Sequence, residues 1–300
     1  MSGMRISLAL LGMHKWFGGD HTKVAELVAL ADRKGVDQVT VVDHVVMGEH
    51  VEAYPFGKFQ GSPSSDWLEP LVELGVYAGM TKRIRLSAGI VITPLRPAAL
   101  LAKQLATLDV LSRGRVEIGV GVGWQKEEYD ACGVPWKGRF GLMHEQMRAC
   151  RLLWTQEPAT FKGKRVAFER IYCKPFPVQK GGIPIYYGVA ASELNIERMA
   201  ELADGWLPID TDPVKIKEPV RRIRAALEAR GRDAARFDVR ASPLRVRTQA
   251  HVADLDAMLR SIPQYADAGV TTLRIQVADY CPGPDEYEHV IERLVAGARG

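Results

Sequence analysis

The sequence is poor in cysteine, in long apolar runs and in net charge, and each shortage excludes a class of protein. It has four cysteines among 300 residues, with no Cys-x-x-Cys motif and no histidine at ligand spacing, so we expect free thiols and no metal site. No apolar run approaches the roughly 18 residues that a membrane-spanning helix needs. The net charge is only +4, and the densest basic segment, 220–232, carries apolar residues at helical spacing, which disfavours a nucleic-acid partner. The apolar run at 5–12 is typical of a strand rather than of a signal peptide, so we expect a cytoplasmic protein with no membrane partner.

What the sequence has instead is a regular alternation of apolar strands and amphipathic helices. About eight strand–helix pairs are present, which is the number that closes a barrel, whereas an open doubly wound sheet usually has fewer strands. We therefore predict an α/β fold, a (β/α)8 TIM barrel formed by residues 1–300 as a single domain. The predicted strands are 5–12, 36–46, 83–92, 115–121, 183–189, 205–209, 237–247 and 271–278, and the predicted helices are 21–35, 66–80, 97–112, 138–154, 192–204, 213–231, 251–269 and 285–298.

Two long segments interrupt this alternation. Residues 47–65, after the second strand, are rich in Gly, Pro and Ser, and residues 155–182, after the fourth strand and its helix, contain alternating aromatics. Long loops in a barrel usually cover a site, so we expect both insertions near the barrel mouth, the second as a hairpin or loop.

The stretch "GRVEIGVGVGW" (114–124) has the glycine density of a phosphate-binding loop. The dinucleotide fingerprint G-x-G-x-x-G fails here, because its third glycine position is Trp124 and residues 125–138 are too broken by Gly and Pro for the required helix. Two interpretations remain open. Either small residues let neighbouring backbones pass closely, or Gly121 and Gly123 clear space for a flat ring at the catalytic face.

Several motifs, in order along residues 5–210, resemble those of the luciferase-like flavin-dependent superfamily of TIM barrels. They are "DH" at 43–44, "AGIVITPLR" at 88–96, the stretch from 100 to 136 that contains the glycines, "KPFPVQKGGIPIYYG" at 174–188 and "MAELADGW" at 199–206. The chain is most similar to the branch that uses the 5-deazaflavin coenzyme F420, and residues beyond 210 match only in pattern.

The resemblance assigns roles at the ends of the second and third strands. His44 is implied as the catalytic proton donor or acceptor, a role that an imidazole titrating near neutral pH can fill. Asp43 either orients the loop, contacts the cofactor or is an ordinary turn residue. A cis peptide is implied at Gly89–Ile90, where it would form a backstop for the cofactor ring, although an ordinary strand glycine is the alternative. Thr93 would bond the polar edge of the ring.

The loop between the fifth strand and its helix is the implied phosphate site. Gly188, Val189, Ala190 and Ala191 precede Ser192, a typical N-cap residue, and free N–H groups at a helix start bind anions. Relatives often have a pair of glycines where this chain has Ala190 and Ala191. The alternative is an ordinary capped helix without a ligand.

Trp124 stands where the deazaflavin-dependent sugar-phosphate dehydrogenases of this superfamily have a catalytic glutamate. An indole cannot act as a general acid but can line an apolar pocket, so we expect a less polar substrate. The other candidate pocket residues are Trp16, Tyr54 and Phe56, with Phe17 and Trp136 nearby, although these aromatics equally suit a core or a dimer interface.

Three hypotheses for the activity follow. The first is an F420-dependent oxidoreductase that exchanges a hydride with a small or medium, rather apolar organic substrate. The second is a monooxygenase of the same fold that uses reduced FMN, and the third is a non-catalytic cofactor carrier, which the retained Asp43 and His44 disfavour. The resemblance also implies a homodimer.

Overall fold

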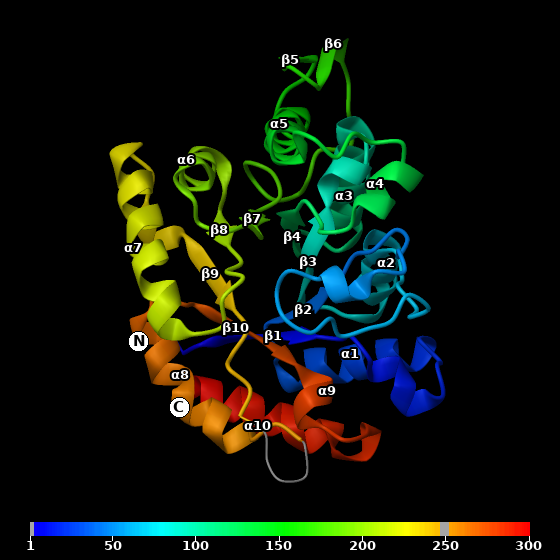
Figure 1. The fold of residues 1–300 in the computed structure, drawn as a ribbon, viewed down its shortest axis with the longest axis vertical. Helices are drawn as coiled ribbons and strands as arrows, with labels where there is room; N and C mark the ends of the chain where they lie inside the picture. The colour runs from blue at the N-terminus through cyan, green and yellow to red at the C-terminus, as the bar shows by residue number, and fades with distance from the viewer. Residues whose placement is uncertain (1–2, 247–251) are drawn as a thin grey trace.

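The central element of the computed structural model, which describes residues 3–246 and 252–300, is a closed barrel of eight parallel strands (Figure 1). The order around the barrel is β1-β10-β9-β8-β7-β4-β3-β2. The predicted (β/α)8 barrel is therefore confirmed. The strands are β1 (Arg5–Ala9), β2 (Gln38–Val41), β3 (Arg85–Ile92), β4 (Val116–Gly121), β7 (Ile185–Tyr187), β8 (Gly205–Trp206), β9 (Asp238–Ala241) and β10 (Thr272–Gln276).

The helices between the strands begin and end at residues whose chemistry explains the boundary. Gly35 ends the first helix in the left-handed conformation, with φ of 86°. The second helix begins at Pro70 rather than at 66, because the side chain of Glu69 accepts a hydrogen bond from the N–H of Val72 and caps it there. The main helices are α1 (Thr22–Lys34), α2 (Pro70–Met80), α3 (Ala98–Leu111), α5 (Arg139–Leu153), α6 (Glu193–Leu202), α7 (Pro213–Ala229), α8 (Leu255–Asp267) and α10 (Tyr287–Arg299).

Two short helices were not expected. The first, α4 (Lys126–Ala131), follows the glycine run, where we expect no helix. The second, α9 (Val277–Tyr280), begins directly after Gln276, so the strand predicted at 271–278 is two residues shorter at its carboxyl end. The strands predicted at 205–209 and 237–247 are shorter than expected, and residues 247 and 251 of the predicted elements lie outside the described residues. No helix in the described part of the chain is long and apolar enough to cross a membrane.

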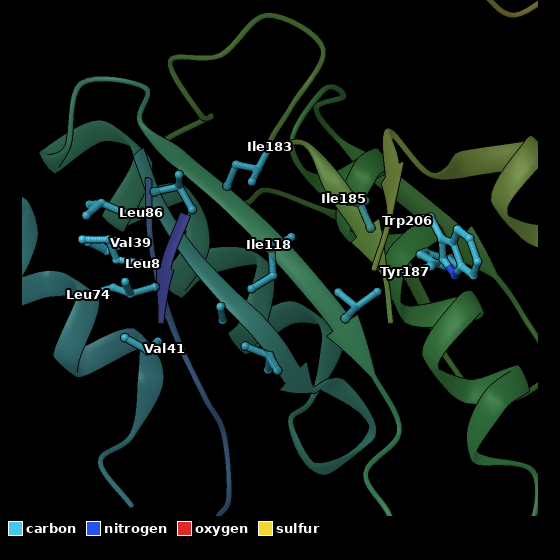
Figure 2. Close-up of a cluster of buried hydrophobic side chains, with 14 of the residues drawn as sticks. Leu8, Val39, Val41, Leu74, Leu86, Ile118, Ile183, Ile185, Tyr187 and Trp206 are labelled. Atoms are coloured by element: carbon cyan, nitrogen blue, oxygen red, sulfur yellow. The ribbon is translucent and has the colours of Figure 1, made fainter. Parts of the chain in front are cut away.

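The apolar core lies between the strands and the surrounding helices. Figure 2 shows part of it, where Leu8, Val39 and Leu86 of neighbouring strands lie close to Leu74 of α2. Alternate residues on the same strands face the barrel interior, where side chains are mainly polar. The strands therefore mostly have an apolar face toward the helices and a polar face toward the barrel axis, so the side chains inside the barrel are mainly polar.

The two insertions lie in different places. Residues 155–182 form an antiparallel hairpin, β5 (Ala159–Lys162) and β6 (Ala167–Ile171), that Figure 1 shows beyond α5 on the side away from the barrel strands. Phe161 of the hairpin packs on Ala149 of α5. The expectation of a hairpin is confirmed, and its apolar face is buried against α5. The hairpin turn lies beside the start of α5, where a Cβ on Gly138 would meet the guanidinium of Arg165. Its place near the barrel mouth stays a prediction. The insertion after β2 does approach the mouth, as described next.

Candidate active site

His44 follows the carboxyl end of β2, and a buried carboxylate faces it. Its Nδ1 atom lies 3.3 Å from Oε1 of Glu128, whose side chain is fully buried. The contact is electrostatic, because the two atoms are not aligned for a hydrogen bond. The same Oε1 accepts a hydrogen bond of 3.0 Å from the backbone N–H of Val45. Glu128 thus fixes the imidazole and the chain after it, and leaves Nε2 as the nitrogen that can meet a ligand.

Glu128 is one candidate site residue that sequence reasoning missed. It belongs to α4, the short helix that the nearby Gly133 and Pro135 made unexpected. The signal that could have revealed it is the pair Glu128–Tyr129, which α4 turns toward the interior while Glu127 stays exposed. Once the segment is recognised as helical, its inward face carries this carboxylate.

An aromatic cluster surrounds the imidazole. The ring of His44 lies 4.8 Å from that of Trp67, 5.9 Å from Phe59 and 6.4 Å from Trp124. Tyr54 joins the cluster, with its ring 5.2 Å from Trp124 and 5.3 Å from Phe59. Because Tyr54 and Phe59 belong to the 47–65 insertion, this insertion covers His44 with apolar rings. Sequence reasoning named Tyr54 and Trp124 but missed Phe59 and Trp67.

Three other aromatics from the sequence analysis lie outside this cluster. Phe56 is 52% exposed and contacts Tyr54 alone among the rings of the described residues. Trp16 packs against Tyr287 of α10, with ring centres 6.3 Å apart, and Trp136 lies under the guanidinium of Arg139. The structure therefore does not bring Trp16 or Phe56 to His44, because other partners already bury or tether them.

Asp43 has a positioning role. Its carboxylate is buried, accepts two hydrogen bonds from the guanidinium of Arg96 at 2.6 and 3.0 Å, and accepts a third of 2.7 Å from the N–H of Ile92. Burial opposes the charge of Arg96, but Asp43 and Glu69 outweigh it and raise the pKa of the guanidinium. Since both oxygens of Asp43 are engaged, its side chain ties the end of β2 to the end of β3, and a cofactor contact stays a prediction.

The Gly89–Ile90 peptide is cis, as the resemblance implied. The side chain of Ile90 then fills the space above two glycines, because a Cβ on Gly121 would lie 2.6 Å from its Cδ1 and a Cβ on Gly188 would overlap its Cγ2. Gly123, with φ of 62°, faces Ile92 in the same way. The expectation that Gly121 and Gly123 clear space for a flat ring stays a prediction. They make room for isoleucines of β3, and Ile90 presents the apolar surface.

The loop before α6 has the features expected of an anion site. The hydroxyl of Ser192 accepts a hydrogen bond from the N–H of Asn195, which confirms the predicted N-cap. Trp206 donates to the carbonyl of Val189 at 2.8 Å and fixes the loop, while the N–H groups of Ala190 and Ala191 find no acceptor among the described residues. These two donors and the start of α6 are therefore available to a ligand.

Further polar atoms around the barrel mouth are buried without partners in the described part of the chain. They include the hydroxyl of Thr93 and the indole N–H groups of Trp67 and Trp124. Buried polar groups are normally hydrogen-bonded, so an unpartnered set beside His44 indicates a place where a polar ligand is accommodated.

A cavity lies at the opposite end of the barrel from His44. It has a volume of about 400 Å³ and opens at the amino ends of the strands, which in a barrel is the end that serves stability. Its lining includes Arg5, Asp37, Arg83, Arg85 and Arg299.

Next to Trp67, ligand atoms of His14, His21 and Asp66 lie within 4.8 Å of one another. This group could hold a metal ion, and the sequence spacing did not indicate it. Burial and the neighbouring His21 lower the pKa of His14. All four cysteines are free thiols, as predicted.

The geometry agrees with the result of a family comparison. The family model for luciferase-like monooxygenases matches residues 9–294. The chain belongs to this family. It is therefore an enzyme of the luciferase-like oxidoreductase and monooxygenase family, as the resemblance of its motifs implied.

Members of the family and similar structures differ in the cofactor that their names record. An uncharacterised protein of Mycobacterium tuberculosis is 35% identical over 229 residues, which is 76% of each chain. The FMNH2-dependent dimethylsulfone monooxygenase of Pseudomonas putida is 35% identical over 155 residues, which is 50% of this chain and 42% of that one. The structure of an F420-dependent secondary alcohol dehydrogenase with an F420–acetone adduct covers 99% of this chain and 100% of its own, with a TM-score of 0.78 and 17% identity.

Proposed function

We propose that this enzyme is an F420-dependent oxidoreductase that moves a hydride between the deazaflavin and a small or medium organic substrate. The observation that carries the proposal is His44, held by buried Glu128 and enclosed by aromatic rings at the barrel mouth. A carbonyl carbon that receives a hydride leaves an oxygen that needs a proton, and an imidazole can supply it near neutral pH. When bound, the deazaflavin supplies the hydride transfer.

The residues at the barrel mouth fit such a cofactor. Ile90 offers an apolar surface for a flat ring, and the unpartnered hydroxyl of Thr93 can bond the polar edge of that ring. The N–H groups of Ala190 and Ala191, together with the positive end of α6, can hold a phosphate. The residues that the family resemblance indicated thus provide an apolar surface, a hydrogen-bonding group and N–H donors for an anion.

His44 exchanges the proton through Nε2, while Nδ1 stays beside Glu128. The carboxylate faces Nδ1 at 3.3 Å and so orients the ring with Nε2 toward the substrate. Phe59, Trp67 and Trp124 exclude water from the imidazole, so the proton passes to the substrate oxygen rather than to solvent.

An FMNH2-dependent monooxygenase is the second candidate, favoured by the 35% identity to the Pseudomonas putida enzyme. A non-catalytic carrier has no need of a buried acid–base pair and fits less well. The homodimer that the resemblance implies stays a prediction.

Titration of the purified protein with F420 and with FMN, followed by cofactor fluorescence, tests the proposal. We expect micromolar binding of F420 and negligible binding of FMN. The reverse result would overturn the F420 assignment and select the monooxygenase. An Ala190→Asp variant should weaken binding of the selected cofactor about tenfold or more, since its charge repels the phosphate. Ala235→Asp, an exposed change after α7, is the matched control and should bind normally.

A further inference from the structure

Arg274 of β10 points into the barrel interior toward the candidate site. Its neighbour on the same strand face, Thr272, is in register with Arg240 of β9, whose guanidinium reaches Glu117 of β4 across the barrel. Residues two apart on a strand share a face, so Arg274 also faces the interior. A Cβ placed on Gly89 would lie 3.7 Å from Nε of Arg274. Because β10 and β3 are not adjacent strands, this contact crosses the interior beside the cis peptide.

Arg274 has no counter-ion among the described residues. Its Nε is buried without a partner, and the described residues offer it no ion pair. The residues outside the described part, 1–2 and 247–251, include no aspartate or glutamate. Asp279, the carboxylate that influences it, is paired with Arg245 at 2.8 Å. Burial and the positive charge of Arg245 lower the pKa of Arg274 to about 10.

The two interior arginines contrast sharply. Arg240, near the amino ends of the strands, is paired with Glu117 at 2.5 Å and with Asp238 at 2.8 Å. Arg274 lies nearer the carboxyl ends, where it interacts electrostatically with Tyr54 of the aromatic cluster. An unpaired charge in a barrel interior is costly to fold around, so its presence beneath the cluster indicates a ligand that completes it.

We infer that Arg274 binds an anionic oxygen of the substrate, so that the enzyme acts on small organic carboxylates. The inference rests on the proposed function for the location of the substrate, and it deepens that function by naming the substrate class. The substrate then contacts the rings of Tyr54 and Trp124 with its apolar part and the guanidinium with its carboxylate. The substrate expected from Trp124 is rather apolar, and the inference adds a carboxylate group to it.

The anion that Arg274 binds could also be the ionised ring of a reduced cofactor. The experiment distinguishes this ring from a substrate carboxylate. Calorimetry on cofactor-free protein measures binding of acetate and benzoate against their neutral amides at constant ionic strength. A second titration measures the affinities for oxidised and reduced cofactor. Each is done with wild type, Arg274→Met, Arg274→Lys and Arg260→Met, whose arginine is exposed on α8.

We expect wild type to bind benzoate more tightly than benzamide, and Arg274→Met to lose about tenfold or more of the carboxylate affinity alone. Arg274→Lys should recover part of it, and Arg260→Met should behave as wild type. Unchanged carboxylate binding in Arg274→Met overturns the inference, and a selective loss of affinity for reduced cofactor would assign the arginine to the cofactor instead. Because the carboxylate titration needs no cofactor, failure of the F420 assignment leaves this result readable. Arg274→Met should melt no lower than wild type, since the change removes a charge that has no carboxylate partner among the described residues.

Discussion

At the scale of single residues, the proposed function gives the two nitrogens of His44 different tasks. Nδ1 faces Glu128, and Nε2 is left for the substrate. Glu128→Gln keeps the shape of the side chain and can still accept the hydrogen bond from Val45, but it removes the negative charge that faces Nδ1. We expect this variant to lose about tenfold to a hundredfold in kcat, and His44→Ala to lose about a hundredfold or more, with cofactor affinity unchanged in both. Steady-state kinetics and cofactor titration measure the two quantities separately.

The control is Glu127→Gln, which removes a charge from the exposed side of the same short helix. It should retain wild-type kcat. An equal loss in both glutamine variants would show that α4 contributes only its net charge. A collapse of cofactor binding in His44→Ala would make His44 a cofactor contact rather than a proton carrier.

At the scale of elements, the end of β3 depends on glycines of the two strands that follow it around the barrel. Ile90 lies against Gly121 at the end of β4 and Gly188 just after β7. A Gly188→Ala change would force a methyl group into the Cγ2 of Ile90, and such overpacking costs about 1–3 kcal/mol. We expect urea unfolding to show this loss together with weaker cofactor binding.

A double-mutant cycle checks the cause of that loss. In the Ile90→Ala background the nearest remaining atoms are the carbonyl oxygen of Val120, 3.5 Å from the added methyl, and Cβ of residue 90 at 3.7 Å. Both are ordinary van der Waals distances, so Gly188→Ala should cost little there. If the cost of Gly188→Ala were the same in both backgrounds, the glycine would be needed for a reason other than Ile90.

The same elements show what could be predicted from the sequence. The alternation of apolar strands with amphipathic helices predicts the barrel, because buried parallel strands need apolar runs and covering helices need one apolar face. Helix α4 could not be predicted, since the Gly and Pro near it disfavour a helix that tertiary packing nevertheless stabilises. The candidate site could be located from the sequence at His44 and Ser192, because both lie within five residues of the carboxyl end of a strand. Glu128 and Arg274 were not, because whether their side chains face inward depends on helix phase and barrel register.

At the scale of the whole molecule, the barrel interior changes in character from its amino end to its mouth. Near the amino ends of the strands, Arg240 bridges Glu117 and Asp238, and Gln38 donates to Glu117 at 2.5 Å. Near the mouth, Arg274 has no partner in the described residues. If the proposed site is right, changes at the paired end should affect stability, and changes at the unpaired end should affect ligand binding.

The ion pairs of Asp238 at the amino ends of the strands lead to a prediction about how the free energy of unfolding changes at acid pH. Burial opposes ionisation of Asp238, but Arg240 and Arg5 outweigh it and lower the pKa of the carboxyl to about 2. The folded-state pKa lies below the unfolded value of 3.8, so the stabilisation is fully present above about pH 4 and is lost as the pH falls toward 2. From this shift it amounts to about 2 kcal/mol. Urea unfolding of wild type at pH 7, 4 and 3 should show this loss.

Asp238→Asn identifies the group responsible for that pH dependence. It should be less stable than wild type at pH 7, because Arg240 and Arg5 lose their shared carboxylate, and the gap to wild type should narrow as the pH falls from 4 toward 2. Asp267→Asn is the matched control: its pair with Lys217 is exposed on the outer helices, and its loss should cost at most about 1 kcal/mol at any pH. A gap between Asp238→Asn and wild type that stays constant between pH 4 and 3 would contradict the prediction, since the carboxyl would then not titrate with a lowered pKa.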